Sequence, residues 1–165
     1  MRHGIRLGVD VGSVRVGLAA SDPSGILATP IKTLERDLKS CADQGAIASV
    51  VLQRGVLEVV VGLPRSLSGG EGPAAAGARS YASALAVRIS PTPVRLIDER
   101  LTTIDAHRQL REAGVAGRAQ RGLVDQAAAV LILQAALDAE QSSGLPPGEL
   151  VGGRKPRTPR TQAEG

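Results

Sequence analysis

The sequence Ile5-Arg6-Leu7-Gly8-Val9-Asp10-Val11-Gly12 contains an apolar run that ends in a carboxylate. Such a run is typical of a central strand, where a desolvated carboxylate is costly unless it has a partner or binds a metal ion. Asp and Gly are also ordinary turn formers, so a turn is the simpler interpretation of Asp10 when it is taken alone. Acidic residues further along the chain decide between the two interpretations.

Strand-like runs open the chain, and the turns that join them are too short for crossover helices, so we expect an antiparallel meander. Helices and strands then alternate, which predicts parallel pairing with right-handed crossovers. The expected strands cover residues 5–10, 14–21, 26–34, 56–61 and 94–97, and the expected helices between them cover residues 38–53 and 74–89. The sequence therefore predicts an α/β fold with a mixed five-stranded sheet, an antiparallel meander followed by β-α-β-α, flanked by helices.

Two further helices are expected in the last third of the chain. A Thr-x-x-Asp sequence at residues 102–105 is typical of a helix start, and we expect a helix to about residue 113. Residues 114–122 form an expected mobile loop, and Asp125 begins an Ala-rich helix to about residue 139. Beyond Gly144 no apolar period remains. We therefore assign residues 1–142 to one domain and residues 143–165 to a basic, disordered tail.

The chain of 165 residues has a formal net charge of +4, most of which lies near its end. Residues 153–165 hold four basic residues and one acidic residue, a net charge of +3, which leaves +1 for the rest. A basic tail adds affinity for polyanions, although a solvated tail without a ligand explains it equally well. The chain has one Tyr and no Phe or Trp, which excludes an aromatic platform for stacked bases.

Membrane, secretory and cysteine signals are weak in this sequence. No apolar run approaches the roughly 18 residues of a membrane span, and no secretory signal is evident before the first strand. We therefore expect a cytoplasmic protein with no membrane partner. Cys41 is the sole cysteine, which excludes an internal disulfide and a Cys-rich zinc site. We interpret it as a small, partly buried helix residue, with an intermolecular disulfide as the alternative.

Three acidic residues are expected at one edge of the sheet. The carboxyl ends of parallel strands share that edge, and open sheets bind their ligands there. Asp10 ends the first strand, Glu99 follows the fifth, and Asp125 begins a helix that could cross the edge. Converging carboxylates repel unless divalent cations lie between them. Oxygen ligands favour Mg²⁺ or Mn²⁺, and two such ions suit in-line displacement at a phosphodiester. We therefore predict these three acids as catalytic and metal-binding residues.

Each of these acids also has a structural interpretation. Asp98 and Glu99 could be one acidic strand end paired with Arg100, since strand alternation lets only one of them face a site. Asp125 could simply be a helix N-cap. The order and placement of the acids along the chain together favour a site.

Four blocks of the sequence resemble, in order, the motifs of the YqgF/RuvX family. They cover the chain from about residue 5 to residue 138. The blocks are Asp10-Val-Gly12-Ser-Val-Arg15-Val-Gly17-Leu-Ala with Ser21-Asp22, Val60-Val61-Gly62-Leu63-Pro64 with Gly70-Glu71-Gly72-Pro73, Asp98-Glu99-Arg100-Leu101-Thr102-Thr103, and Val124-Asp125-Gln126-Ala127-Ala128-Ala129 with Ile132-Leu133-Gln134. Their number and order make the resemblance specific.

The resemblance implies an RNase H-like fold and a metal-dependent nuclease. It implies a role either in ribosome biogenesis, by processing the 5′ end of the 16S ribosomal RNA precursor, or in DNA recombination, by resolving Holliday junctions. It also implies that Asp10, Glu99 and Asp125 are the metal-binding acids. Two departures from the family pattern bear on the strength of substrate binding. The family's Lys-rich run before the last of these acids has here only Arg118 and Arg121, and an aromatic residue usual near the end of the last helix is Ala136.

Four arginines are candidates for binding the phosphates of nucleic acid, namely Arg15, Arg100, Arg118 and Arg121. Arg15 lies just past Asp10, and an Arg can pair with a phosphate through two N–H groups, although a surface ion pair is an equal alternative. The expected partner is a ribosomal RNA precursor or branched DNA, and the sequence does not choose between RNA and DNA. Resolving a junction would require two active sites, which a homodimer provides.

Two other classes of function are compatible with these residues. A non-catalytic nucleic-acid-binding module would keep the same fold and bind without cleaving. An actin-like ATPase also begins its phosphate loop with Asp-x-Gly on an RNase H-like core, but such enzymes need a second lobe, for which 165 residues leave no room. We therefore predict a nuclease that hydrolyses phosphodiester bonds.

Overall fold

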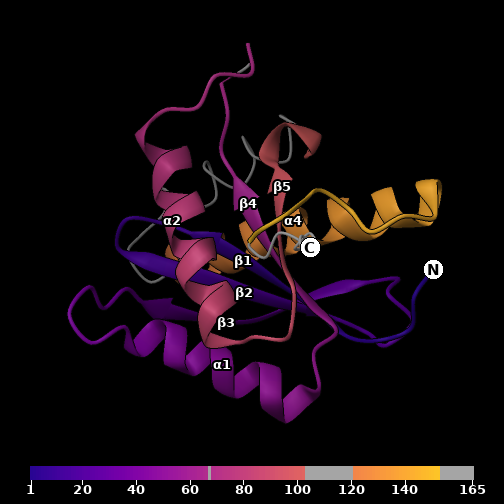
Figure 1. Ribbon diagram of the computed structural model, residues 1–165, viewed down its shortest axis with the longest axis horizontal. Helices are drawn as coiled ribbons and strands as arrows, with labels where there is room; N and C mark the ends of the chain where they lie inside the picture. The colour runs from indigo at the N-terminus through magenta and orange to yellow at the C-terminus, as the bar shows by residue number, and fades with distance from the viewer. Residues whose placement is uncertain (67, 103–120, 153–165) are drawn as a thin grey trace, which may run out of the picture.

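The computed structural model describes residues 1–66, 68–102 and 121–152, with the backbone alone for residues 121–125. Within them, six strands form one mixed sheet in the order β3-β2-β1-β4-β5-β6 (Figure 1). The elements are β1 (Arg6–Val11), β2 (Arg15–Ser21), β3 (Ala28–Glu35), α1 (Ala42–Arg54), β4 (Glu58–Leu63), α2 (Pro73–Arg88), β5 (Val94–Asp98), the 3-10 helix η1 (Glu99–Leu101), α4 (Arg121–Ser143) and β6 (Glu149–Leu150). The predicted α/β class, with a meander followed by parallel strands, is confirmed.

Local turns explain the antiparallel half of the sheet. The Gly12 N–H donates to the Arg15 carbonyl at 2.8 Å and closes the turn between β1 and β2. Between β2 and β3, the Asp22 carboxylate accepts hydrogen bonds from the backbone N–H groups of Ile26 and Leu27, both at 2.8 Å. These bonds favour the ionised carboxylate and lower the pKa of Asp22. Both connections are short, so β1, β2 and β3 form the expected meander.

Helical crossovers build the parallel half of the sheet. α1 connects β3 to β4 and ends at Gly55, whose φ of 59° lies in the left-handed region that favours glycine. α2 connects β4 to β5 and begins at Pro73, which the first turn of a helix accepts because no N–H is needed there. With these crossovers β1 pairs in parallel with β4, and β4 with β5. The carboxyl ends of β1, β4 and β5 therefore lie at the same edge.

Helices cover both faces of the sheet. α1 and α2 share a core with the side chains of Leu7 and Val9, whereas α4 packs on the opposite face. Gly8 allows α4 to come close, because a Cβ at Gly8 would stand 2.7 Å from the Cβ of Leu133. Side chains alternate between the faces of a strand, so Gly8 and Asp10 both face α4.

The sheet has six strands rather than the five expected. β6 lies in the segment assigned to the tail and pairs antiparallel with β5, with Leu150 opposite Arg95. The Val151 N–H also donates to the Val94 carbonyl at 2.8 Å. β6 pairs backbone groups that an edge strand would otherwise expose, and two residues are too few for an apolar alternation to reveal the strand. Residues 153–165 of the predicted tail lie outside the described residues.

The ends of the helices also differ from expectation. α1 begins at Ala42, so Cys41 is the partly buried residue just before the helix rather than a residue within it. α4 begins at Arg121, four residues before Asp125, so the interpretation of Asp125 as an N-cap is wrong. Most of the helix expected from residue 102 and of the loop after it falls in residues 103–120, which lie outside the described residues.

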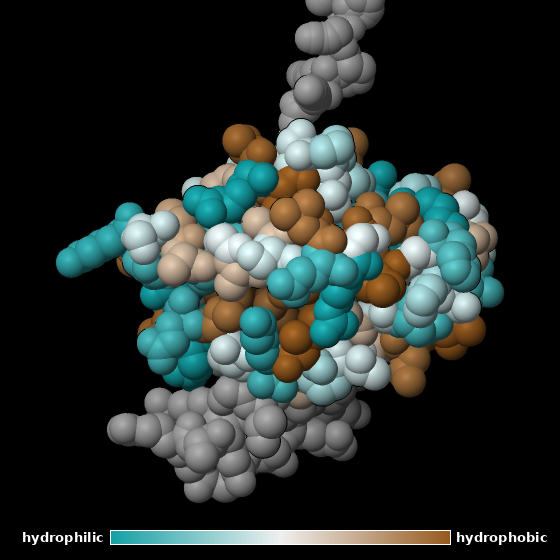
Figure 2. Space-filling view, turned by 90° about the horizontal axis from the view of Figure 1, so that it is seen from below, coloured by the Kyte–Doolittle hydropathy of each residue, from teal (hydrophilic) through white to brown (hydrophobic). Residues whose placement is uncertain are grey.

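Two surface observations bear on the expected partners. The face over α1 mixes hydrophobic and hydrophilic side chains rather than offering one continuous apolar surface (Figure 2). This face therefore does not single out a surface for the homodimer. Within the described part of the chain, no helix has both the length and the apolar character that a bilayer crossing requires.

Candidate active site

The candidate site lies where β1, β4 and β5 end, with β4 in the middle. The parallel register pairs Val9 of β1 with Val61 of β4, and Gly62 of β4 with Ile97 of β5. The next residue of β1 is Asp10, so Asp10 adjoins Gly62 at the edge of the sheet. Asp10 is partly buried, as its place near the end of a central strand predicts.

Glu99 brings the second carboxylate to the same place. It begins η1, directly after the last residue of β5. Its Oε2 atom lies 2.7 Å from the point where a Cβ on Gly62 would stand, so the carboxylate extends over the middle strand. The Cδ1 atom of Ile132, on α4, lies 2.5 Å from the same point, so the carboxylate lies on the α4 face. Asp10 and Glu99 therefore share one edge and one face of the sheet.

Gly62 is a candidate site residue whose role our sequence reasoning missed, because the expected strand ended at residue 61. It lies within β4, where any side chain would overlap both Glu99 and Ile132. The signal was present, since a glycine that follows three valines in a strand often marks a close approach of another group.

Asp98 differs from its neighbour Glu99 because arginines surround it. Its carboxylate accepts hydrogen bonds from Arg100 at Nη2 (2.6 Å), at Nε (3.0 and 3.1 Å) and at the backbone N–H (2.9 Å). The Nη1 atom of Arg65 lies 3.8 Å away. These contacts, led by that with Arg100, hold the pKa of Asp98 below its ordinary value. The alternative that pairs the acidic strand end with Arg100 is therefore correct for Asp98.

Glu99 has no such cation beside it in the part of the chain that the structure describes. Among the described residues, no hydrogen bond or ion pair involves its carboxylate, and the hydroxyl of Thr102 donates to the backbone carbonyl of Glu99 at 2.7 Å. Burial raises the pKa of Glu99, and the nearby charge of Asp98 raises it further. An ionised carboxylate in this position gains from a cation placed beside it.

The course of α4 bears on the third predicted acid. At the carboxyl-terminal end of α4, Glu140 lies 3.4 Å from Arg6 at the start of β1, and further along β1 the Ala129 carbonyl lies 2.9 Å from a Cβ placed on Gly8. α4 thus runs opposite to β1, with its earlier residues toward Asp10. Asp125 precedes Ala129 by one turn of the helix, and its side chain lies outside the described residues.

The four predicted phosphate-binding arginines are not equally described. Arg15 begins β2, just after the turn that follows Asp10, and is partly buried. Arg100 is held by Asp98. Arg121 is the first residue of α4 with its side chain outside the described residues, and Arg118 lies outside them altogether.

The donor set suits a hard divalent cation. Asp10 and Glu99 offer carboxylate oxygens, which are the ligands that Mg²⁺ and Mn²⁺ prefer. Where side chains are described, no three His, Cys, Asp or Glu residues come together as a metal site. The side chain of Asp125 lies outside the described residues, so its place in such a site stays a prediction.

Comparisons with known proteins agree with the fold and the motifs. The chain matches the RuvX family model, described as Holliday junction resolvase, over residues 4–139. A protein of Nocardioides sp. is 56% identical over 153 residues, covering 92% of this chain and 98% of its own. A Streptomyces coelicolor protein is 54% identical over 152 residues, covering 92% and 90%. Both are named "Putative pre-16S rRNA nuclease".

Among solved structures, T. thermophilus RuvC in complex with a Holliday junction substrate is similar with a TM-score of 0.55 and 16% identity, covering 90% of this chain and 99% of its own. At this identity the likeness shows the fold, which is RNase H-like as predicted. The family match covers most of the chain, including β1, β4, β5 and α4. The chain therefore belongs to the RuvX family.

Proposed function

We propose that this chain is a divalent-metal-dependent nuclease that hydrolyses phosphodiester bonds in structured nucleic acid. The observation that carries the proposal is the Glu99 carboxylate, which extends over Gly62 beside the strand position of Asp10 and has no cation among the described residues. Membership of the RuvX family supports it, as do relatives named for pre-16S rRNA cleavage. The substrates we propose are the 5′ region of a 16S ribosomal RNA precursor and the Holliday junction, and either places the protein in the cytoplasm.

Each residue has a distinct role in the proposed reaction. Asp10 and Glu99 would hold two Mg²⁺ or Mn²⁺ ions, and Asp125 would complete the ligand set from α4. When bound, such ions lower the pKa of water and stabilise the charge that develops on a phosphate during hydrolysis. Gly62 leaves room for the Glu99 carboxylate, and Ile132 of α4 closes the space beside it.

Basic residues position the nucleic acid in this proposal. Arg15, Arg100, Arg118 and Arg121 contact backbone phosphates, since a guanidinium pairs well with such groups. A homodimer would supply the two active sites that junction resolution needs. The homodimer itself stays a prediction.

A side-by-side cleavage assay tests the proposal. The full chain is incubated with an RNA covering the 5′ end of a 16S precursor and with a four-way DNA junction, at physiological salt, with Mg²⁺, with Mn²⁺ or with EDTA. We expect cleavage of at least one substrate that EDTA abolishes and that Asp10→Asn reduces strongly. The matched control is Asp138→Asn, the same change at an exposed position near the other end of α4.

Two outcomes would contradict the proposal. Full activity of Asp10→Asn would remove the assigned residues from the reaction. Binding of either substrate without cleavage under any divalent ion would instead favour a non-catalytic nucleic-acid-binding module with the same fold.

A further inference from the structure

A row of alternating charges crosses the carboxyl edge of the sheet beside Glu99. We call it the charged row, and its six members in spatial order are Arg100, Asp98, Arg65, Glu71, Arg79 and Glu149. They come from η1, the end of β5, the loop between β4 and α2, α2 itself and β6. The row therefore connects η1, β5, α2 and β6 with the loop that follows β4.

Arg65 is the least satisfied member of the charged row. Its Nη2 lies 3.1 Å from Glu71 and its Nη1 only 3.8 Å from Asp98. Its Nε is buried and has no hydrogen-bond partner among the described atoms. Arg79, by contrast, donates four hydrogen bonds of 2.8 to 3.2 Å to Glu71 and Glu149. A guanidinium has five N–H donors, so Arg65 retains unused capacity for an oxygen-rich ligand.

The partners of Arg65 can be exchanged. Its side chain is 27% exposed and that of Glu71 is 29% exposed. Ion pairs this close to solvent stabilise a protein little, because water already solvates both charges well. A backbone phosphate offers two non-bridging oxygens, which can accept two parallel N–H bonds from one guanidinium, so it can take the place of an exposed carboxylate.

The place of Arg65 in the chain links it to the candidate active site. Arg65 lies two residues after the end of β4, the strand that carries Gly62 beneath the Glu99 carboxylate. Its second acidic partner, Asp98, is the residue before Glu99. A nucleic-acid strand bound at Asp10 and Glu99 would meet the charged row as it leaves the site across β4 and β5.

We propose that Arg65 binds a backbone phosphate of the substrate strand next to the bond that is cleaved, and that Glu71 competes with this phosphate when no substrate is bound. Glu71 is held in turn by Arg79, so it keeps a cationic partner after Arg65 leaves it. The inference rests on the proposed nuclease function for the identity of the substrate. Its readout is binding rather than cleavage.

Binding of the full chain to both labelled substrates, the RNA and the four-way junction, is measured in EDTA over a range of salt concentrations. The variants are Arg65→Ala, Arg65→Lys, Glu71→Gln and the double variant Arg65→Ala with Glu71→Gln. Arg54→Ala controls for the lost positive charge, because Arg54 is exposed at the end of α1, on the opposite edge of the sheet. Asp138→Asn controls for the lost negative charge. Thermal unfolding of every variant confirms that it is folded.

We expect Arg65→Ala to weaken binding about tenfold and to reduce the slope of log affinity against log salt by about 0.7 to 0.9, the effect of losing one phosphate contact. We expect Arg65→Lys to retain part of the binding affinity and part of the salt dependence. Glu71→Gln tightens binding about threefold, since one good ion-pair competitor is removed. The double variant should bind no more tightly than Arg65→Ala alone, because Glu71 affects binding only through Arg65.

Two results would overturn the inference. One is a salt slope for folded Arg65→Ala equal to that of Arg54→Ala. The other is weaker binding by Glu71→Gln, which would mean that Glu71 holds Arg65 in a structural position. Failure of the wild-type chain to bind either substrate would instead count against the proposed function itself.

Discussion

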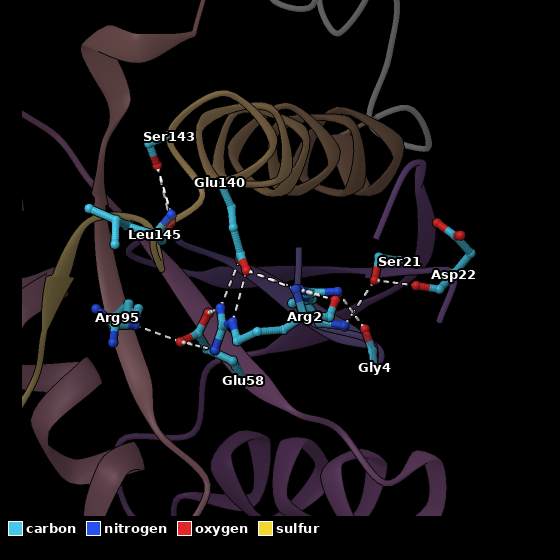
Figure 3. Close-up of polar contacts among 10 residues, drawn as sticks. Arg2, Gly4, Ser21, Asp22, Glu58, Arg95, Glu140, Ser143 and Leu145 are labelled. Atoms are coloured by element: carbon cyan, nitrogen blue, oxygen red, sulfur yellow. Dashed lines mark hydrogen bonds and ion pairs between the residues drawn. The ribbon is translucent and has the colours of Figure 1, made fainter. Parts of the chain in front are cut away.

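The two edges of the parallel part of the sheet handle buried acids in opposite ways. At the amino-terminal edge, Glu58 is fully buried and Glu140 is 2% exposed, and both are paired with arginine. Arg2 lies between them, with Nη2 at 2.9 Å from Glu58 and 2.8 Å from Glu140 (Figure 3). At the carboxyl-terminal edge, Glu99 is half-buried and no described residue supplies it with a cation.

The pKa shifts express the same difference. Hydrogen bonds from Arg2 lower the pKa of Glu140 to about 2, whereas burial raises the pKa of Glu99. One edge is closed by charges that the chain itself provides, and it holds α4 against β1 and β4. At the other edge, the described residues provide no cation for the ionised form of Glu99. The comparison separates acids that stabilise the fold from the acids to which we assign a role in the proposed reaction.

The largest effect is expected at Glu99. Glu99→Gln should reduce cleavage by at least about 100-fold, a loss that even the outer partners of metal ligands can cause. It should not lower thermal stability in EDTA, because it removes a carboxylate whose ionised form is disfavoured. Mg²⁺ or Mn²⁺ at 100 times its Kd should stabilise the wild type by about 2.7 kcal/mol and this variant by less. Asp138→Asn is the control, and a destabilised Glu99→Gln with unchanged cation response would reverse the assignment.

At the opposite edge, Glu140 should affect stability rather than chemistry. Glu140→Gln leaves Arg2 and the buried Arg6 short of negative charge, and we expect a loss of about 3 kcal/mol in the free energy of unfolding. Urea unfolding measures it. The control is Glu149→Gln, which removes an exposed acid paired with Arg79 and should change stability by about 0.5 kcal/mol or less. Equal effects of the two variants would show that the buried network is no stronger than a surface pair.

A substitution of Gly62 tests whether the Glu99 carboxylate lies over β4 as the structure places it. Gly62→Ala places a methyl group against Ile132 and the Glu99 carboxylate, so we expect a loss of about 1 to 3 kcal/mol in unfolding free energy together with weaker cleavage. Gly77→Ala is the matched control, because nothing lies within 4 Å of a Cβ on this residue of α2. If Gly62→Ala folds and cleaves like the wild type, the placement of Glu99 over β4 is wrong.

The sequence predicts the outlines of this site because its signals are local. Asp10 and Glu99 each follow an apolar strand, and the alternation of strands and helices between them is enough to predict parallel pairing and hence a shared edge. The role of Gly62 cannot be recognised from neighbouring residues, since it depends on contacts with Glu99 and with Ile132 of α4, which lie far away in the sequence. The contribution of the Asp125 side chain stays a prediction.

The amino-terminal edge and the last strand escape sequence reasoning for a related reason. Arg2 and Glu140 are 138 residues apart, and neither belongs to a motif that would suggest their pairing. β6 has two residues and pairs with the open edge of β5. Ion pairs and edge strands of this kind depend on which segments the folded chain brings together, which no local periodicity records.

The smallest expected effect is the pH dependence of stability, and it has opposite signs at the two edges. The folded-state pKa of Glu140 lies below its ordinary 4.5, so its contribution is present above about pH 4.5 and is lost as the pH falls toward 2. The pKa of Glu99 is raised, so its contribution is present below pH 4.5 and is lost as the pH rises through the shifted value. Glu140→Gln should therefore flatten the loss of stability in acid.

Glu99→Gln should do the reverse and gain stability relative to the wild type as the pH rises from 4 to 7. Urea unfolding in EDTA across pH 3 to 7 measures both trends without interference from bound cations. Parallel pH profiles for wild type and Glu99→Gln would mean that Glu99 is already neutralised by a cationic group of the chain. That result would make the carboxyl edge resemble the amino-terminal one and would remove the physical reason for a metal ion there.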